Sequence, residues 1–175
     1  RILIMRKLAV WLVGMSILVA VNFAIWQKEQ LLTHGKTVIL ALAPVDPRSL
    51  MQGDYMRLRF QAEQDMQRYL PYKKDSSVAD GYVIVSLNEQ HIGEVQGVVS
   101  ELPATIAANQ WPLRYRIRAG ELRFATNAFF FQEGHADDYA QARYGEFKVS
   151  NDGEMLLANL RGQHLEVLGF QAVIK

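Results

Sequence analysis

The sequence contains no cysteine among its 175 residues. This absence excludes disulfide bonds, lipid attachment through cysteine, thiolate metal sites and a cysteine nucleophile. The chain also has little excess charge, because 19 Lys and Arg residues nearly balance 18 Asp and Glu residues, giving a formal net charge of +1. A near-neutral chain offers no electrostatic argument for binding nucleic acid. The composition, 50% hydrophobic and 21% charged, is that of a globular protein.

Common sequence signatures of catalysis and cofactor binding are missing as well. The chain has no phosphate-binding loop, no dinucleotide fingerprint and no GxSxG nucleophile elbow. Its histidines are scattered, and none has the HxH or HExxH spacing of a metal site. We therefore expect a protein that is not an enzyme and that holds no cofactor and no metal.

What the sequence does contain is one long apolar run, "LAVWLVGMSILVAVNFAIW", over residues 8–26. The run carries no charge, and only Ser16 and Asn22 are markedly polar. As a helix it would be about 29 Å long, close to the thickness of a bilayer core. Trp11 and Trp26 lie near its two ends, where interfacial aromatic residues are found. We predict a transmembrane helix at residues 8–26, with the lipid bilayer as its partner.

Basic residues fix the expected orientation of this helix. Arg6 and Lys7 precede it, so the positive-inside rule places residues 1–7 in the cytoplasm and the rest of the chain outside. One alternative is a cleaved signal peptide with a cleavage site near Val21 and Ala24, although bulky residues follow that site. A helix buried in a soluble core is another alternative, although few soluble helices are apolar on every face.

A connector at residues 27–36 leads to the remaining chain, residues 37–175, which has the alternation of a sheet protein. "YMRLRF" is the clearest case, because Met56, Leu58 and Phe60 would share one face of a strand. We expect a mainly β (β-rich α+β) domain with about eight to ten short strands, in a partly closed barrel or a sandwich. Strands are predicted in the segments 37–43, 55–60, 81–87, 92–100, 113–118, 121–131, 145–150, 154–160 and 164–174.

Two segments favour short helices. In "QAEQDMQRYL" a helix would place four apolar residues together, namely Ala62, Met66, Tyr69 and Leu70. "DDYAQARY" predicts a helical turn that Asp137 or Asp138 caps. An alternative interpretation of the same acidic region is a cation site formed by Glu133, His135, Asp137 and Asp138.

Arginines alternate along one predicted strand, "LRYRIR". Arg114, Arg116 and Arg118 would lie on the face opposite Leu113 and Tyr115. The simplest interpretation is the solvated face of an antiparallel strand. Lipid headgroups, an acidic partner or an anion are the alternatives. An anion-binding or small-molecule-binding site would also use the arginines at 57 and 59.

The segment "APVDPRSLMQGDYMRLRF", residues 43–60, is unusually rigid for a turn before a strand. Its two prolines fix φ and restrict the residues before them. Asp46 can accept backbone hydrogen bonds or pair with Arg48. Gly53 permits positive φ, and Asp54 can bind the turn backbone. These residues make the segment a candidate binding corner.

The end of this segment, "GDYMRLRF", resembles the signature of the GDYXXLXY protein family. Gly53, Asp54, Tyr55 and Leu58 match, whereas Phe60 replaces the final tyrosine. "FFFQEGHADDYAQARYGEFKV" is also similar to that family, and adds Arg143 and Gly145 to the candidate binding residues. The resemblance implies a membrane-anchored bacterial protein with an extracytoplasmic domain, found beside polytopic membrane proteins. It implies no established activity.

A partial resemblance to type I signal peptidases covers two short boxes. "VDPRSLMQGD" is similar to the box that carries their nucleophilic serine, but Val45 stands at the serine position. The stretch comparable to the one that carries their general base offers only arginines, which do not release a proton at neutral pH. The late box is matched at Arg143 and Gly145. The resemblance therefore implies a related fold without the Ser–Lys dyad.

Three functions remain open on the sequence alone. We expect a non-enzymatic accessory protein, anchored in the bacterial inner membrane, whose periplasmic domain binds an integral membrane protein. Gly14 and Ser16 would allow a partner helix to approach the anchor closely. The second is a hydrolase with a rearranged dyad of Ser49 with Lys73 or Lys74, and the third is the anion-binding domain.

Overall fold

A computed structural model describes residues 2–43, 51–52, 55–69, 78–118, 121–126, 128–131 and 133–169. The chain divides into two compact units, with the boundary between His34 and Gly35. The first unit is a single helix, and the second is the sheet domain that contains most of the motif residues.

Helix α1 runs from Ile2 to His34, so it continues through the polar residues after the apolar run and ends before Gly35. Its segment Arg6–His34 is long and apolar enough to cross a membrane, with a mean hydropathy of 2.3 in its most apolar window, none of which is buried. The two polar residues of the run bind their own helix: Ser16 donates to the Leu12 carbonyl and Asn22 to the Leu18 carbonyl, each at 2.8 Å. Each side chain therefore places one of its N–H or O–H donors on a backbone carbonyl of the helix, which reduces the cost of the polar group in an apolar surrounding.

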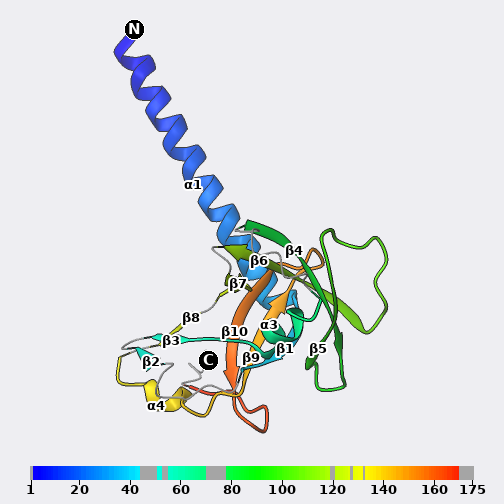
Figure 1. The fold of residues 1–175 in the computed structure, drawn as a ribbon. Helices are drawn as coiled ribbons and strands as arrows, with labels where there is room; N and C mark the ends of the chain where they lie inside the picture. The colour runs from blue at the N-terminus through cyan, green and yellow to red at the C-terminus, as the bar shows by residue number, and fades with distance from the viewer. Residues whose placement is uncertain are drawn as a thin grey trace. The chain divides into compact units, whose positions relative to one another are not determined.

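Three antiparallel sheets make up the domain in the part of the chain that the structure describes, and Figure 1 shows their order along the chain. The first sheet has the order β1–β9–β10, the second β2–β3–β8 and the third β5–β4–β6–β7. The strands are β1 (Lys36–Ala41), β2 (Met51–Gln52), β3 (Tyr55–Arg57), β4 (Val78–Leu87), β5 (Gly93–Val99), β6 (Gln110–Arg118), β7 (Glu121–Arg123), β8 (Ala128–Phe130), β9 (Tyr144–Val149) and β10 (Met155–Arg161). Two short helices, α3 (Gln61–Met66) and α4 (Ala136–Tyr139), complete the described elements.

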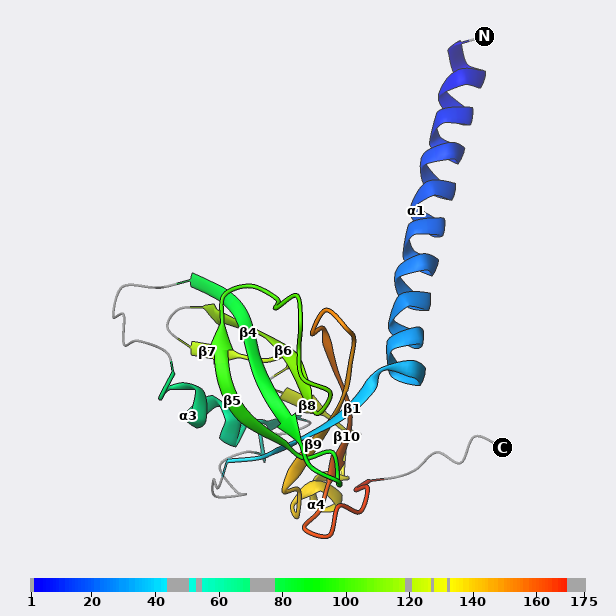
Figure 2. The ribbon, with the colours of Figure 1, turned by 90° about the vertical axis from the view of Figure 1, so that its right-hand side faces the viewer.

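The prediction of a mainly β, β-rich α+β domain is confirmed, and the described strands do not form a closed barrel. Single bridges connect the sheets: Ile39 within β1 pairs with Ile92 just before β5, and Leu42 just after β1 pairs with Phe60. Figures 1 and 2 both show the β1–β9–β10 sheet beside the four-stranded sheet. Two hairpins connect neighbouring strands: β4–β5 surrounds "NEQH", and β9–β10 surrounds "NDG" with Gly153 at φ +80°, a conformation that suits glycine in a tight turn.

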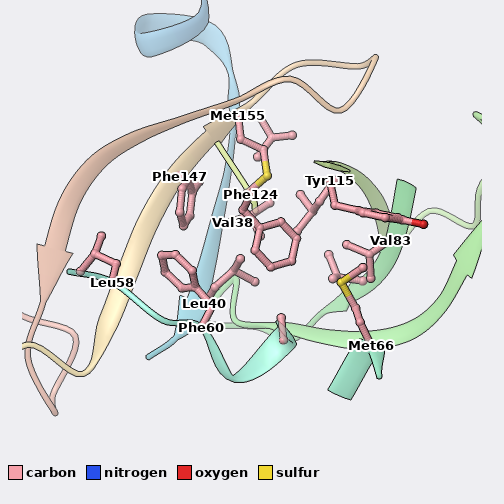
Figure 3. Close-up of a cluster of buried hydrophobic side chains, with 14 of the residues drawn as sticks. Val38, Leu40, Leu58, Phe60, Met66, Val83, Tyr115, Phe124, Phe147 and Met155 are labelled. Carbon is pink, nitrogen blue, oxygen red and sulfur yellow. The ribbon is translucent and has the colours of Figure 1, made fainter. Parts of the chain in front are cut away.

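The hydrophobic core lies where these sheets face each other. Both large sheets contribute fully buried side chains, for example Val38 from β1 and Val83 from β4. The Phe60 ring, 0% exposed, meets Phe147 edge-on at 5.3 Å and Phe124 at 6.1 Å between ring centroids. Figure 3 shows these three rings together in the cluster. Edge-on aromatic pairs of this kind add about 0.5–1.5 kcal/mol each to the burial term.

Two helix predictions are wrong in detail. Helix α3 buries Ala62 and Met66 as expected, but it ends at Met66, so Tyr69 leaves the apolar face and is 48% exposed. In α4 neither Asp137 nor Asp138 is the cap, because His135 occupies the N-cap position without a side-chain capping bond. Both aspartates lie in the first turn instead, where a negative charge suits the helix dipole.

The predicted last strand is also wrong as far as the structure describes it. Residues 164–169 contain no strand, and only Val167 forms a bridge, to Arg161. Leu165 has φ +64° and Gly169 has φ +86°, conformations that interrupt an extended chain. The segment folds back along β10, where the Leu168 N–H donates to the Leu160 carbonyl at 2.9 Å.

Candidate functional site

The end of β1, the end of the motif strand and the start of β9 meet at one place, which we call the motif corner (residues 42, 43, 59, 60, 143 and 145). Leu42 N–H donates to the Arg143 carbonyl and Ala43 N–H to the Arg59 carbonyl, each at 2.8 Å. Leu42 also bridges to Phe60. The structure therefore joins the "GDYMRLRF" stretch to the "ARYGEF" stretch, although more than half of the domain separates them in sequence.

Gly145 and Phe60 explain why these two stretches belong together. A Cβ placed on Gly145 would lie 3.0 Å from Cε1 of Phe60, and 3.3 Å from side chains of Leu157 and Phe147. A glycine at this position lets the Phe60 ring pack directly on the backbone of β9. Gly145, proposed from the sequence as a binding residue, therefore has a packing role in the structure.

The other described motif residues separate into core and surface. Leu58 is 1% exposed and belongs to the core, where the alternation of the strand had placed it. Tyr55 is half-buried, and its ring lies 5.8 Å from that of Phe130, the residue opposite it on β8. Phe130 is itself 75% exposed. The two rings give the β2–β3–β8 sheet an aromatic surface at its outer strand.

Arg143 differs from its neighbours because its side chain is exposed. The guanidinium donates to the Ala142 carbonyl at 3.3 Å, and no carboxylate within the described ranges forms an ion pair with it. Its backbone is held on both sides, since its N–H donates to the Arg161 carbonyl at 2.8 Å. Hydrogen bonds thus hold the backbone of Arg143 in place, and its side chain puts a positive charge at the motif corner.

The remaining candidate residues lie outside the described residues: Asp46, Arg48, Gly53 and Asp54. The same holds for Ser49, Lys73 and Lys74, the residues of the hydrolase alternative. The assignment of Asp46, Arg48, Gly53 and Asp54 as binding residues therefore stays a prediction.

A buried polar cluster lies beside the motif corner, and sequence reasoning missed it. Glu146 is only 5% exposed, yet its carboxylate accepts hydrogen bonds from Arg161 Nε at 2.8 Å and Asn159 Nδ2 at 3.1 Å. Lys148 Nζ lies 4.0 Å from the other oxygen of the same carboxylate and donates to Thr37 Oγ1 at 2.8 Å. We call these five residues the Glu146 cluster.

A β-bulge creates the Glu146 cluster. The register of β9 with β10 shifts between Leu157 and Asn159, so Asn159 rather than Ala158 lies opposite Glu146. The shift also puts Leu160 on the core side, opposite Gly145. The only sequence signal was an acidic residue in the middle of "YGEFKV", and simple alternation assigns such a residue to solvent.

The contacts within the Glu146 cluster indicate a structural role for its charged side chains. Its carboxylate already has two donors, and its lysine contacts both an acid and a hydroxyl. The contact of Lys148 with Thr37 is a hydroxyl–lysine pair, the residue types of a Ser–Lys-like dyad. Because the same ammonium faces Glu146 on a half-buried surface, we interpret it as part of an ion network that stabilises the sheet.

The acidic segment before α4 does not assemble the proposed cation site. Within the described part of the chain, no three His, Asp or Glu side chains group as metal ligands. His135 Nδ1 instead lies 2.7 Å from Asp138 Oδ2, an exposed i,i+3 pair. The predicted helical turn therefore fits this region better than a cation site does, although the residue at its N-cap is His135.

The predicted arginine stripe is confirmed and lies on the outer face of the four-stranded sheet. Arg114 and Arg116 are exposed, whereas Leu113 and Tyr115 between them are buried. Arg118 forms a two-pronged ion pair with Asp80 on β4, at 2.7 and 3.3 Å. The hydrogen bond from Arg118 is the main cause that lowers the pKa of Asp80. Desolvation opposes this shift, and the charges of Arg118, Arg116 and Arg114 lower the pKa further.

This ion pair gives a pH prediction. We expect the Asp80 carboxyl to titrate below its ordinary value of 3.8, and Arg118→Gln to move the midpoint upward. Because the folded pKa is lowered, the stabilisation is present above the unfolded value and is lost as the pH falls through the folded one. Carboxyl NMR chemical shifts measured across this pH range test the prediction. A midpoint that Arg118→Gln leaves unchanged would contradict the pairing.

Comparison with known proteins now adds the family. A family model described as "GDYXXLXY protein" matches residues 17–160, which is most of the chain. The chain belongs to the GDYXXLXY family. The match includes both stretches that meet at the motif corner and most of the apolar run of α1. No curated protein and no solved structure matches the chain. The family name describes a sequence motif and assigns no activity.

Proposed function

We propose that this protein is a non-enzymatic accessory module, anchored in the bacterial inner membrane by α1, whose extracytoplasmic domain binds an integral membrane protein. The observation that carries the proposal is the helix itself. Its 29-residue segment Arg6–His34 has the length and hydropathy of a membrane span, and the two markedly polar side chains of its apolar run, Ser16 and Asn22, donate hydrogen bonds within the helix. Basic residues before the apolar run and the mixed charges after it support a cytoplasmic N-terminus.

The arrangement of the domain supports binding rather than chemistry. The described motif residues are core positions, a half-buried tyrosine and an exposed arginine, and the buried acid is engaged by basic and amide side chains. Exposed aromatic and arginine side chains are typical of protein interfaces. A partner in the same membrane would meet such a domain at high effective concentration, because both are tethered to one surface.

The membrane anchor gives a direct prediction. Replacing Ile17 and Val19 together with arginine should move the full-length protein out of the carbonate-resistant membrane fraction. Two arginines at the middle of a span cost about 6 kcal/mol on insertion scales. The matched control is Gln27→Arg, which adds a charge after the apolar run and should leave the protein in the membrane. Equal membrane retention of all three proteins would contradict a spanning helix.

The accessory role is tested by purifying the tagged full-length chain from native membranes in mild detergent. We expect native mass spectrometry to show an assembly with an integral membrane protein, and the intact mass to include the helix. A chain that always runs alone as a monomer would overturn the accessory role. An intact mass that lacks residues 1–24 would instead show a cleaved signal peptide.

A further inference from the structure

The outer face of the β4–β6–β7 strands carries an unusual concentration of positive charge. We call it the arginine face, and Figures 1 and 2 show its strands side by side. Its arginines come from two strands: Arg114, Arg116 and Arg118 from β6, and Arg123 from β7. Asp80 on β4 is an acidic residue of the same face, opposite Arg116 in register.

The register brings positive charges together on this face. Arg116 lies directly opposite Arg123 on β7. Asp80 forms its two-pronged ion pair with Arg118, and its single negative charge is too small to balance the exposed Arg114 and Arg116 as well. Within the described chain, no ion pair involves either of these two arginines. The face thus retains positive charge that an external anion can neutralise.

We propose that the arginine face binds an extended, carboxylate-rich segment of a partner protein, and this rests on the accessory role proposed above. Alternate residues of a strand repeat at about 6.6–6.8 Å. An extended peptide has the same repeat, so acidic residues at alternate positions can face Arg114 and Arg116 in turn. The Arg118–Asp80 pair shows the geometry in which a guanidinium of this face takes a carboxylate.

The composition of the face favours a peptide over a lipid surface. Asp80 would repel a uniformly anionic bilayer, whereas a peptide can place a neutral or basic residue opposite it. Lipid-binding surfaces also combine basic residues with exposed apolar ones. Among the described residues of the domain, the large exposed hydrophobic side chains are Tyr69, Leu102 and Phe130. Tyr69 follows α3, Leu102 lies in a loop and Phe130 lies on β8, so none of them belongs to β4, β6 or β7.

The test uses the full-length chain in discs of zwitterionic lipid and a fluorescent peptide of alternating glutamate and threonine. Arg114→Gln with Arg116→Gln should weaken the peptide at least about tenfold in an anisotropy titration, because two charge-assisted contacts are lost. The matched control is Arg57→Gln with Arg59→Gln, which removes the same charge from exposed arginines elsewhere and should change the affinity less than about twofold. Asp80→Asn should strengthen binding, because it releases Arg118.

Each other outcome overturns the proposal. Absence of wild-type binding, or equal loss in the two double variants, would show that the arginine face is no specific site. If discs that contain anionic lipid abolish peptide binding, the lipid surface is the preferred occupant. Native purification separates this failure from that of the accessory role. A wild-type chain that co-purifies with a membrane protein equally well after Arg114→Gln with Arg116→Gln retains the role and loses the site.

Discussion

Replacing Glu146 with alanine is expected to lower the free energy of unfolding by about 3–5 kcal/mol. The substitution removes the carboxylate that Arg161 and Asn159 bind in a nearly solvent-free position. It leaves the Arg161 guanidinium half-buried without its acid, and Lys148 without its nearest carboxylate. Denaturant unfolding of the full-length chain in detergent micelles, followed by circular dichroism, measures the loss.

A matched control and a double variant separate the ion pair from a general strand effect. Glu94 is an exposed glutamate on β5, and its change to alanine should alter stability by no more than about 0.5 kcal/mol. The double change Glu146→Met with Arg161→Met should lose clearly less than the sum of the two single changes, because the Arg161 guanidinium no longer stays behind without its carboxylate. A Glu146→Ala loss as small as that of Glu94→Ala would show that the buried carboxylate adds little.

The Glu146 cluster also marks where prediction from the sequence ends. Alternation along "YGEFKV" correctly places Phe147 and Val149 in the core and assigns Glu146 to the opposite face. Burial of that opposite face depends on the bulge at Ala158 and on the segment after β10, where the Leu165 carbonyl accepts from Arg161. Both depend on how the chain folds back after β9, and neither has a local sequence pattern.

Local sequence patterns were sufficient to predict side-chain burial where one face of a strand is buried and the other is exposed to solvent. The motif strand shows this well: Met56, Leu58 and Phe60 are buried, while Arg57 and Arg59 are exposed. Regular pairing nevertheless stops at Arg57, because Phe60 bridges to β1. Alternation therefore predicted the burial of these side chains better than the extent of the strand.

The candidate site was predicted less well than the fold, for two reasons. The family resemblance marks all residues of a motif as candidates for binding, but a motif can contain both residues that pack in the core and residues that bind a partner. Leu58 and Gly145 are packing positions in the structure, whereas Arg143 presents its charge to solvent. The arginine face was visible as a pattern, but only the register with β4 and β7 shows which charges oppose one another.

Replacing Phe60 with alanine is expected to lower the free energy of unfolding by about 3–5 kcal/mol, similar to the loss for Glu146. The ring is 0% exposed, and it packs against Phe147 and Phe124 from two other parts of the chain. Its removal leaves a cavity between the sheets that rigid strands cannot close. The same unfolding measurement on the full-length chain gives the result. A loss below about 1 kcal/mol would show that the core collapses around the site.

Gly145 tests whether the two family stretches are joined by this packing. Gly145→Ala should cost about 1–3 kcal/mol, because the new Cβ would lie 3.0 Å from the Phe60 ring. Gly97→Ala is the matched control on β5, where an added Cβ meets nothing within 4 Å, and it should cost nothing. In a Phe60→Leu background the cost of Gly145→Ala should fall, because the smaller side chain yields space. Additive losses would mean that the two residues act separately. Coupled losses would assign the end of the family motif to the core, and leave its Gly53–Asp54 start as the part to examine for binding.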